Sequence, residues 1–297
     1  MIIEPFYLKI VQSVYQTKTL VGASKALCLT QSALSQAIKK LEKQLGVVVW
    51  EKSGRTIQLT TAGLFLVDAA NRILPQLEQL GHDVKKLSSG VVGNLRIGME
   101  CYPCYRWIRQ IIGTYLTDWP DVDLDILKQF TFKGLQALLN HEVDILITPD
   151  AVSHRGVVFY PVFDYEQVLV VANAHPFAGR THIQPDDLKD QILITYPIET
   201  HRLDIYKDFM TPNKILPNKH IYIEDTDILL QMVAANRGVS ALPRWLVEEE
   251  QRQFGIAPVS LGDPGVFQTI HLGVREDRKR PAYQRAFLEL AGARLSE

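Results

Sequence analysis

Two of the three cysteines, Cys101 and Cys104, form a CxxC motif, the spacing at which two thiols meet on neighbouring turns of one helix. Such a pair suits two kinds of chemistry, a thiol–disulfide switch or half of a zinc site. The chain has no second CxxC and no histidine close by in sequence, which argues against zinc. The motif follows a predicted strand, at the strand end where an α/β domain holds its ligand. We therefore expect both side chains to line a pocket.

A second group of polar side chains lies on one face of a predicted helix at residues 30–46. Leucine and isoleucine recur at helical spacing on the opposite face and form an apolar stripe that seats the helix. Thr30 can cap the N-terminus, and Gly46 can end the helix. Small hydrogen-bonding side chains followed by lysines suit the major groove of DNA and its phosphates. The expected DNA contacts are Thr30, Gln31, Ser32, Ser35, Gln36, Lys39, Lys40 and Lys43.

This polar face has an ordinary alternative, a solvated surface, and the flanking segments favour DNA binding instead. Residues 20–27 contain small side chains that let two helices cross closely, and a tight connection follows them. Residues 47–59 predict two short strands joined through Ser53 and Gly54, with Arg55 at the tip. Together these segments predict a winged helix-turn-helix in which Arg55 is a further DNA contact.

The distribution of charge agrees with that assignment. Residues 1–60 contain eight lysines and arginines against three acidic residues, a net charge of +5. Since the whole chain carries −1, the remainder carries −6. A basic head on an acidic body is expected when only one end of a protein meets phosphate.

The length of 297 residues and the 46% hydrophobic content predict two or three folding units with large cores. The N-terminus lacks the pattern of a secretory signal, and no apolar stretch is long enough to span a bilayer. With Cys28 as the third cysteine, the thiols are too few for a disulfide framework. We expect a cytoplasmic protein.

Residues 61–91 predict one long amphipathic helix followed by a hinge. Its apolar residues are spaced by three or four, Thr60 can cap it, and Pro75 lies inside it. A long apolar stripe with no domain around it needs a partner helix, and the nearest one is the same helix of a second chain. We expect a dimer.

The remaining residues, 92–297, alternate predicted strands and helices, the pattern of parallel sheets with helices on both faces. We expect two sheets in two lobes, because the chain crosses over at about Asp164 and returns near Gly265. Lobe I comprises residues 92–162 and 267–297, and lobe II comprises residues 163–266. Ligands of open α/β sheets lie at the carboxyl ends of the strands, so the cleft between the lobes is the expected site.

The stretch TQSALSQAIKKLEKQLGVVVWEK from Thr30 resembles the pattern TQxALSxxIxxLExxLGxxLFxR of the LysR-type transcriptional regulators. The order of the predicted parts resembles that family over essentially the whole chain. The resemblance implies an α/β fold with an N-terminal all-α winged helix-turn-helix and a two-lobed, periplasmic-binding-protein-like effector domain. It also implies three partners: double-stranded DNA at an interrupted inverted repeat, RNA polymerase, and further copies of the chain in a dimer or tetramer.

Within the family, the chain is most similar to activators of methionine biosynthesis genes that respond to homocysteine. This closer match is carried by ECYPCYRW from Glu100, FDYEQVLV from Phe163, YPIETHRLDIY from Tyr196 and LLQMVAANRGVSALPRW from Leu229. The resemblance implies no cofactor, only a small-molecule co-inducer, homocysteine. The pattern differs at Gln36, where many relatives have Arg, which affects the base contacts and not the mode of docking.

Homocysteine carries a carboxylate, an ammonium group and a thiol, and each needs a different partner. Arg202 is the expected carboxylate ligand, with an ordinary surface arginine as the alternative. The candidates for the ammonium group are acidic residues at strand ends, Glu100, Glu224 and Asp225. The candidates for the rim and the apolar walls are Cys101, Tyr102, Cys104, Phe130, Thr131, Thr148, Tyr196, Pro197, Ile198 and Thr226.

Three classes of function remain to be compared. No P-loop, GxSxG, HExxH or Rossmann fingerprint occurs, so we expect no enzyme activity, no catalytic residue and no metal site. A thiol sensor would share the DNA-binding head but switch by joining Cys101 to Cys104. A binding protein without DNA activity would not need the basic head.

Overall fold

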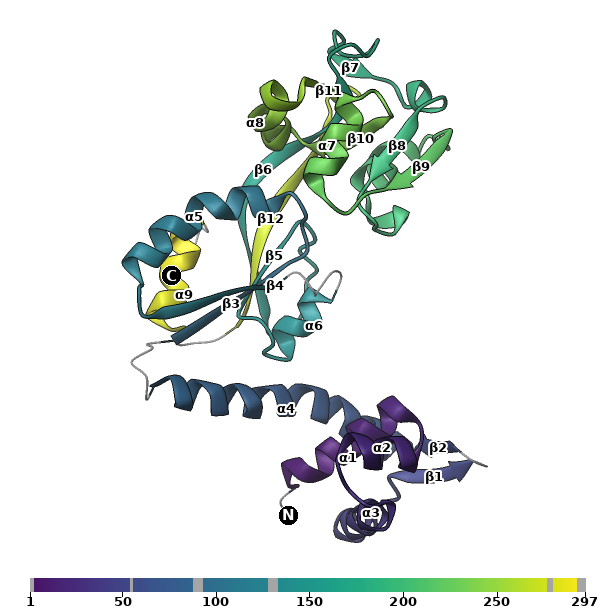
Figure 1. Cartoon of the computed structure of the whole chain (residues 1–297), viewed down its shortest axis with the longest axis vertical. Coiled ribbons are helices and arrows are strands. Elements are labelled where there is room, and N and C mark those ends of the chain that lie inside the picture. Colours follow the sequence, from purple (N-terminus) through teal and green to yellow (C-terminus); the bar gives the residue numbers. More distant parts are fainter. Residues whose placement is uncertain (1–2, 54–55, 88–92, 128–132, 277–279, 293–297) are drawn as a thin grey trace.

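The computed structural model describes residues 3–53, 56–87, 93–127, 133–276 and 280–292. Figure 1 shows a small N-terminal head, one long helix, and a larger domain of two lobes. The head lies at one end of the molecule, and lobe II lies at the other.

The head has the predicted winged helix-turn-helix. Its elements are α1 (Pro5–Thr17), α2 (Leu20–Ala26), α3 (Gln31–Leu45), β1 (Trp50–Ser53) and β2 (Thr56–Leu59). The apolar stripe of α3 is buried at Leu34, Ile38 and Leu41, where it packs against α1. The predicted caps of α3 are confirmed, since the Thr30 hydroxyl accepts from the Ala33 amide at 3.1 Å and Gly46 has φ +70°.

The linker helix α4 (Thr61–Leu87) leaves the head directly from the wing. Thr60 caps it as predicted, because its hydroxyl accepts from the Gly63 amide at 3.1 Å. Val67 and Ala70 are buried against the head. Other apolar side chains of the helix are exposed in the single chain, namely Leu64, Phe65, Ile73, Leu77, Leu80 and Val84.

The effector domain is built on one continuous set of hydrogen-bonded strands in the order β4-β3-β5-β12-β6-β10-β8-β9, with β11 paired to β6 and β7 paired to β11. Lobe I holds β3 (Gly93–Met99), β4 (Val122–Leu127) and β5 (Ile145–Thr148). Lobe II holds β7 (His182–Ile183), β8 (Ile192–Thr195), β9 (Lys219–Tyr222), β10 (Val239–Pro243) and β11 (Ile256–Leu261). Two long strands run through both lobes, β6 (Val157–Ala172) and β12 (Val266–Arg275).

The expectation of two separate parallel sheets was therefore wrong. The segments before and after Asp164 are one strand of 16 residues, and β12 pairs antiparallel with residues 157–167 of it. The polar residue at this point led to the split, but its backbone continues the ladder, with Asp164 opposite Thr269. The remaining strands of each lobe add to this central pair, so the sheet is mixed.

Helices cover both faces of each lobe. In lobe I, α5 (Cys104–Asp118) and α9 (Ala282–Leu290) pack on one face of the sheet, and α6 (Gly134–Leu139) packs on the other. In lobe II, α7 (Thr226–Ala234) and α8 (Arg244–Phe254) pack opposite two short helices, η1 (Pro185–Leu188) and η3 (Ile205–Met210), with η2 (Thr200–Arg202) before η3. Arg202 thus ends a short turn of 3-10 helix, and η3 follows it.

Candidate DNA-binding face and inter-lobe pocket

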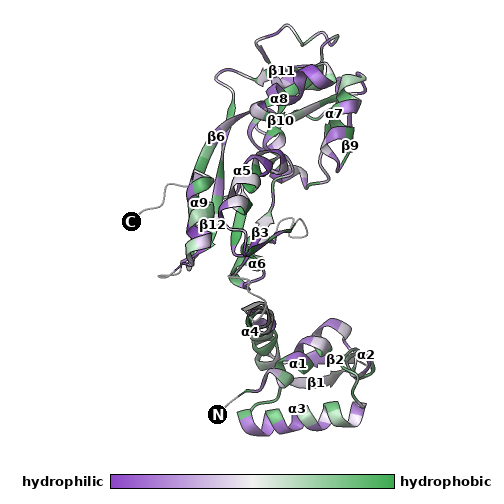
Figure 2. Cartoon of the chain, turned by 60° about the vertical axis from the view of Figure 1, so that its left-hand side comes forward, coloured by the Kyte–Doolittle hydropathy of each residue, from purple (hydrophilic) through white to green (hydrophobic). Residues whose placement is uncertain are grey.

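The outer face of α3 forms a polar surface at the free end of the head. Figure 2 shows α3 at the end of the molecule farthest from lobe II, with polar and apolar residues alternating along it. Ser32, Gln36 and Lys39 are exposed, while the stripe that includes Leu34 is buried. Of the other expected DNA contacts, Thr30, Gln31, Lys40 and Lys43 are exposed, Ser35 is half-buried, and Arg55 lies outside the described residues.

A pocket lies between the lobes, where the carboxyl ends of β3 and β5 in lobe I face the carboxyl ends of β8 and β10 in lobe II. The strand ends place it where open α/β sheets bind ligands. Its wall is part apolar and part charged. It is lined by Glu100, Cys101, Tyr102, Pro103, Pro149, Asp150, Tyr165, Gln167, Thr195, Tyr196, Ile198, Arg202, Leu203, Asp204, Ile205, Ala241, Leu242 and Pro243.

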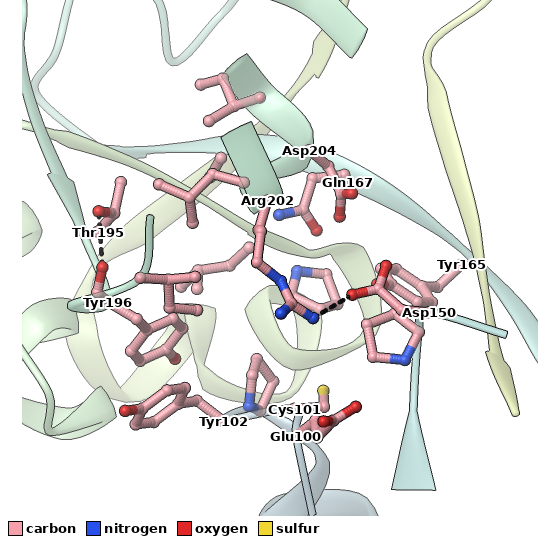
Figure 3. Close-up of a pocket in the computed structure, with 18 residues that line it drawn as sticks. Glu100, Cys101, Tyr102, Asp150, Tyr165, Gln167, Thr195, Tyr196, Arg202 and Asp204 are labelled. Carbon is pink, nitrogen blue, oxygen red and sulfur yellow. Dashed lines mark hydrogen bonds and ion pairs between the residues drawn. The ribbon is translucent and has the colours of Figure 1, made fainter. Parts of the chain in front are cut away.

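One ion pair crosses this pocket from lobe to lobe. Arg202, which ends η2 in lobe II, donates from Nη2 to Oδ2 of Asp150 in lobe I at 2.9 Å (Figure 3). Both side chains are partly exposed, so water screens the attraction. The guanidinium expected to bind a ligand carboxylate is therefore held by a protein carboxylate.

Glu100 lines the pocket, but its carboxylate oxygens already have partners. Oε1 accepts from the Gly134 amide at 2.9 Å, and Oε2 accepts from the Thr148 hydroxyl at 2.8 Å. Thr148 is fully buried, and its hydroxyl accepts in turn from the Asp150 amide at 3.0 Å. Glu100 and Thr148 thus fix the strand ends that carry Cys101 and Asp150.

Two stacked tyrosines close one side of the pocket. The rings of Tyr102 in lobe I and Tyr196 in lobe II are 4.5 Å apart at 7°. The hydroxyls of Tyr196 and Thr226 share a hydrogen bond of 3.0 Å, and burial raises the pKa of Tyr196. Tyr196 is therefore neutral at physiological pH, and the two rings form an aromatic wall.

Cys101 and Cys104 are joined in a disulfide. Cys101 lies against the pocket, whereas Cys104 begins α5 and is fully buried. The pair thus connects the pocket rim to the first turn of α5.

The profile described as "Bacterial regulatory helix-turn-helix protein, lysR family" matches residues 7–64, and the profile of the LysR substrate binding domain matches residues 88–296. The chain belongs to the LysR family of bacterial transcriptional regulators. It is a DNA-binding transcriptional regulator, as the members of this family are, and not an enzyme.

Among LysR regulators, the chain is similar to MetR of Escherichia coli strain K12, with 34% identity over 289 residues, which cover 97% of this chain and 90% of that protein. MetR of Salmonella typhimurium strain LT2 is also 34% identical, over 286 residues, 96% of this chain and 89% of that protein. The regulatory domain of MetR from N. meningitidis matches with a TM-score of 0.62 and 30% identity, covering 67% of this chain and 92% of that one.

A full-length LysR regulator bound to DNA shares the whole fold. CbnR in complex with its target DNA has a TM-score of 0.67 and 22% identity, covering 97% of this chain and 99% of that chain. The match supports the order of head, linker helix and effector domain seen here. Within the described ranges, no helix has the length and apolar character needed to cross a bilayer.

The LysR effector pocket includes some predicted residues and excludes others. Six predicted residues line it: Glu100, Cys101, Tyr102, Tyr196, Ile198 and Arg202. Cys104 and Thr148 are buried behind it, and Pro197 is exposed outside it. Glu224, Asp225 and Thr226 line a different pocket together with Arg106, and Asp225 caps α7 by accepting from the Ile228 amide at 2.9 Å. Phe130 and Thr131 lie outside the described residues.

The sequence analysis did not predict several of the residues that line the pocket. Asp150 follows β5 as Cys101 follows β3, and the strand-end argument applied to both. Tyr165 and Gln167 lie within β6, where a strand residue normally contributes to a core, so no local pattern marked them. Asp204 is two residues from Arg202, a spacing that places two side chains on different faces of a regular helix. Here η2 ends at Arg202 and η3 begins at Ile205, and both side chains line the pocket.

Proposed function

We propose that this protein is a homocysteine-responsive activator of methionine biosynthesis genes. The support is its similarity to MetR proteins over nearly the whole chain, including the segments that build the pocket. In this proposal residues 1–60 bind DNA and residues 92–297 bind the effector. Residues 61–91 connect these two domains.

The observation that carries the assignment of the ligand is the charge of the pocket wall. One guanidinium, from Arg202, faces a surplus of carboxylates that includes Asp150 and Asp204. A small zwitterion complements such a wall, because its carboxylate pairs with Arg202 while its ammonium group pairs with an acid. The half-apolar remainder of the pocket, including Leu203 and Tyr102, accommodates the methylene groups and the thiol.

The protein acts as a dimer or tetramer in this proposal. The exposed apolar side chains along α4 need a partner, and the α4 helix of a second chain supplies one. Two heads related by a dimer axis read an interrupted inverted repeat. The ligand alters the spacing of the heads, which bends DNA differently and exposes a contact for RNA polymerase.

Ligand binding is tested by a thermal-shift screen with homocysteine, methionine, cysteine and unrelated acids, because only ligands of the folded state raise the melting temperature. We expect the largest shift with homocysteine. DNA binding is tested by footprinting, for which we expect two related half-sites. A single unrepeated contact patch, or no shift with homocysteine, contradicts the corresponding part of the proposal.

A second candidate function is a thiol-based redox sensor, which the Cys101–Cys104 disulfide at the pocket rim favours. Breaking it frees Cys101 at the pocket and Cys104 in the first turn of α5. The test is mass spectrometry of alkylated protein combined with DNA binding before and after reduction. A redox sensor changes its DNA contacts on reduction without any effector, whereas an effector-driven regulator does not.

A further inference from the structure

Carboxylates outnumber cationic groups among the described residues of the inter-lobe pocket, because Glu100, Asp150 and Asp204 line it together with Arg202. Asp150 receives the hydrogen bond of Arg202, but Asp204 shares the same pocket and no donor among the described residues hydrogen-bonds its carboxylate. A partly buried carboxylate without a donor is unusual, since such groups are normally paired. A positively charged group bound beside Asp204 would therefore be stabilised by its carboxylate.

A second acceptor in the same pocket is also unsatisfied. The Oε1 atom of Gln167 is buried and has no hydrogen-bond partner. Gln167 lies on β6 and contributes to the pocket wall together with Asp204, and Figure 3 shows both side chains above the guanidinium of Arg202. Leaving a buried carbonyl oxygen unpaired is unfavourable, so a donor from a ligand is favoured there.

The electrostatics show that the acidic groups of the pocket affect one another. Burial and the charge of Asp208 raise the pKa of Asp204 to about 6, Lys207 lowers it, and Asp150 raises it further. Asp204 and Asp150 also raise the pKa of Tyr165, beside the pocket, after the larger effect of burial. A cation bound between these groups relieves this repulsion.

We propose that Asp204 and the side-chain carbonyl of Gln167 form an ammonium-binding subsite, so that the pocket selects free α-amino acids over the corresponding acids without an amino group. An ammonium group has three N–H donors, and the subsite offers acceptors from two elements to orient them. This inference rests on the proposed function for the class of ligand and names the residues that distinguish an amino acid from a simple carboxylate.

The same geometry assigns a role to the Arg202–Asp150 pair. A ligand whose ammonium group lies at Asp204 presents its carboxylate to Arg202, which then exchanges Asp150 for the ligand. The ligand thus replaces an ion pair between the lobes with contacts to lobe II. Asp150, whose side chain is already 43% exposed in the pair, is then solvated by water.

The test is isothermal titration calorimetry on the full-length protein with two matched pairs of probes. The first pair is L-homocysteine and 4-mercaptobutanoate, which lacks only the amino group. The second is L-methionine and 4-(methylthio)butanoate. The variants are Asp204→Asn, which keeps the shape, and Gln167→Met, which removes the carbonyl. Asp208→Asn is the control, because it removes a neighbouring charge on η3 that does not line the pocket.

We expect wild type to bind at least one amino acid about ten-fold or more tightly than its deaminated partner, the effect of one charge-assisted hydrogen bond. Asp204→Asn should remove most of that preference and leave the affinity for the deaminated acid within about three-fold, whereas Asp208→Asn should keep the preference. Gln167→Met should reduce it less than Asp204→Asn does.

Three results overturn the inference: equal binding of an amino acid and its deaminated partner by wild type, an undiminished preference in Asp204→Asn, or binding of none of the four probes. Failure of the proposed function gives a different pattern. In that case methionine binds with its amino group required, and homocysteine does not bind. Melting curves of each variant without ligand check that it is folded.

Discussion

Tyr102 of lobe I lies flat against Tyr196 of lobe II, with ring centroids 4.5 Å apart. This stack and the ion pair of Arg202 with Asp150 join the lobes on two sides of one pocket. On the outer side of the stack, Arg106 of α5 pairs with Asp227 of α7 and with Glu250 of α8, the latter at 3.1 Å. Besides the strands β6 and β12, side-chain contacts thus join the lobes, and among them the tyrosine stack and the Arg202–Asp150 pair line the pocket where a ligand can reach them.

The aromatic stack predicts a difference between two substitutions. Tyr102→Ala removes the stack, worth about 0.5–1.5 kcal/mol beyond its buried area, and should weaken homocysteine binding about three- to ten-fold. Tyr196→Phe keeps the stack, loses only the hydrogen bond to Thr226, and should change affinity less. Calorimetric titration measures both. Equal losses in the two variants would show that the stack does not shape the pocket.

Arg202→Ala should abolish or strongly reduce the response to homocysteine, because a hydrogen-bonded ion pair with the ligand carboxylate is worth about 1.5–3 kcal/mol. DNA affinity without ligand should stay nearly unchanged, since the head is separated from the pocket by α4. Arg180→Ala is the matched control. Arg180 forms an ion pair with Asp187 at 3.0 Å, and neither residue lines the pocket. Reporter activation and gel-shift assays measure the two effects. A normal response in Arg202→Ala would reject the carboxylate assignment.

Replacing Lys39 on α3 with Ala should weaken binding to all DNA sequences and reduce the slope of log K against log salt by about 1, the value for one lost phosphate contact. Gln36→Ala should weaken binding mainly to the specific site, because its amide faces base edges in this docking mode. Fluorescence anisotropy on specific and random duplexes at several salt concentrations separates the effects. Equal losses of affinity by both variants on both duplexes would contradict the assignment of Lys39 to phosphate and Gln36 to the bases.

Leu77→Asp places a charge on the exposed apolar row of α4, where a partner helix is expected. An unpaired charge in an apolar seam costs several kcal/mol, about 3–5 in comparable buried pairs, so the variant should dissociate into smaller species. Gln76→Asp, on the same turn but exposed and polar, is the control. Sedimentation velocity distinguishes the outcomes. If Leu77→Asp sediments like wild type, the main interface lies on the effector domain.

The raised pKa of Asp204, about 6 against the ordinary 3.8, predicts a pH-dependent stability. The folded protein binds more protons than the unfolded chain between these values, so the contribution of Asp204 to stability falls as pH rises from about 4 to about 6. Asp204→Asn should therefore stabilise the ligand-free protein above pH 6, by on the order of 1–2 kcal/mol. Urea unfolding at several pH values measures the difference. A destabilised variant would mean that the carboxylate has a structural partner.

The head could be predicted from the sequence because its determinants are local. Thr30, Gly46 and the leucines of α3 act within a few residues of themselves, and each took the expected position. The wing followed from the short strands around Gly54. Similar local evidence placed the cap of α4 at Thr60.

The residues of the inter-lobe pocket could be predicted only in part, because they come from segments that are distant in sequence and are brought together by the pairing of strands in the sheet. Cys101 could be predicted because it follows the carboxyl end of a strand. Arg202 could be predicted from the stretch YPIETHRLDIY, and both residues line the pocket. Nothing near Gln167 indicates that its carbonyl is left without a partner, since that depends on the packing of β6 against lobe II. The single sheet was missed because a polar residue at position 164 resembles a break, although a pleated strand carries it without interruption.

The paired strands β6 and β12 restrict the ways in which the lobes can move. They are hydrogen-bonded from Val157 opposite Arg275 to Gln167 opposite Val266, with one register shift between Ile270 and His271. Sliding one lobe along the other would shift this ladder by whole residues and turn each side chain to the wrong face. Twisting about the axis of the pair spreads small dihedral changes over many residues and keeps every bond. Twisting is thus the motion of the lobes that this ladder opposes least, so we expect a ligand bound between the lobes to act on the twist of the paired strands.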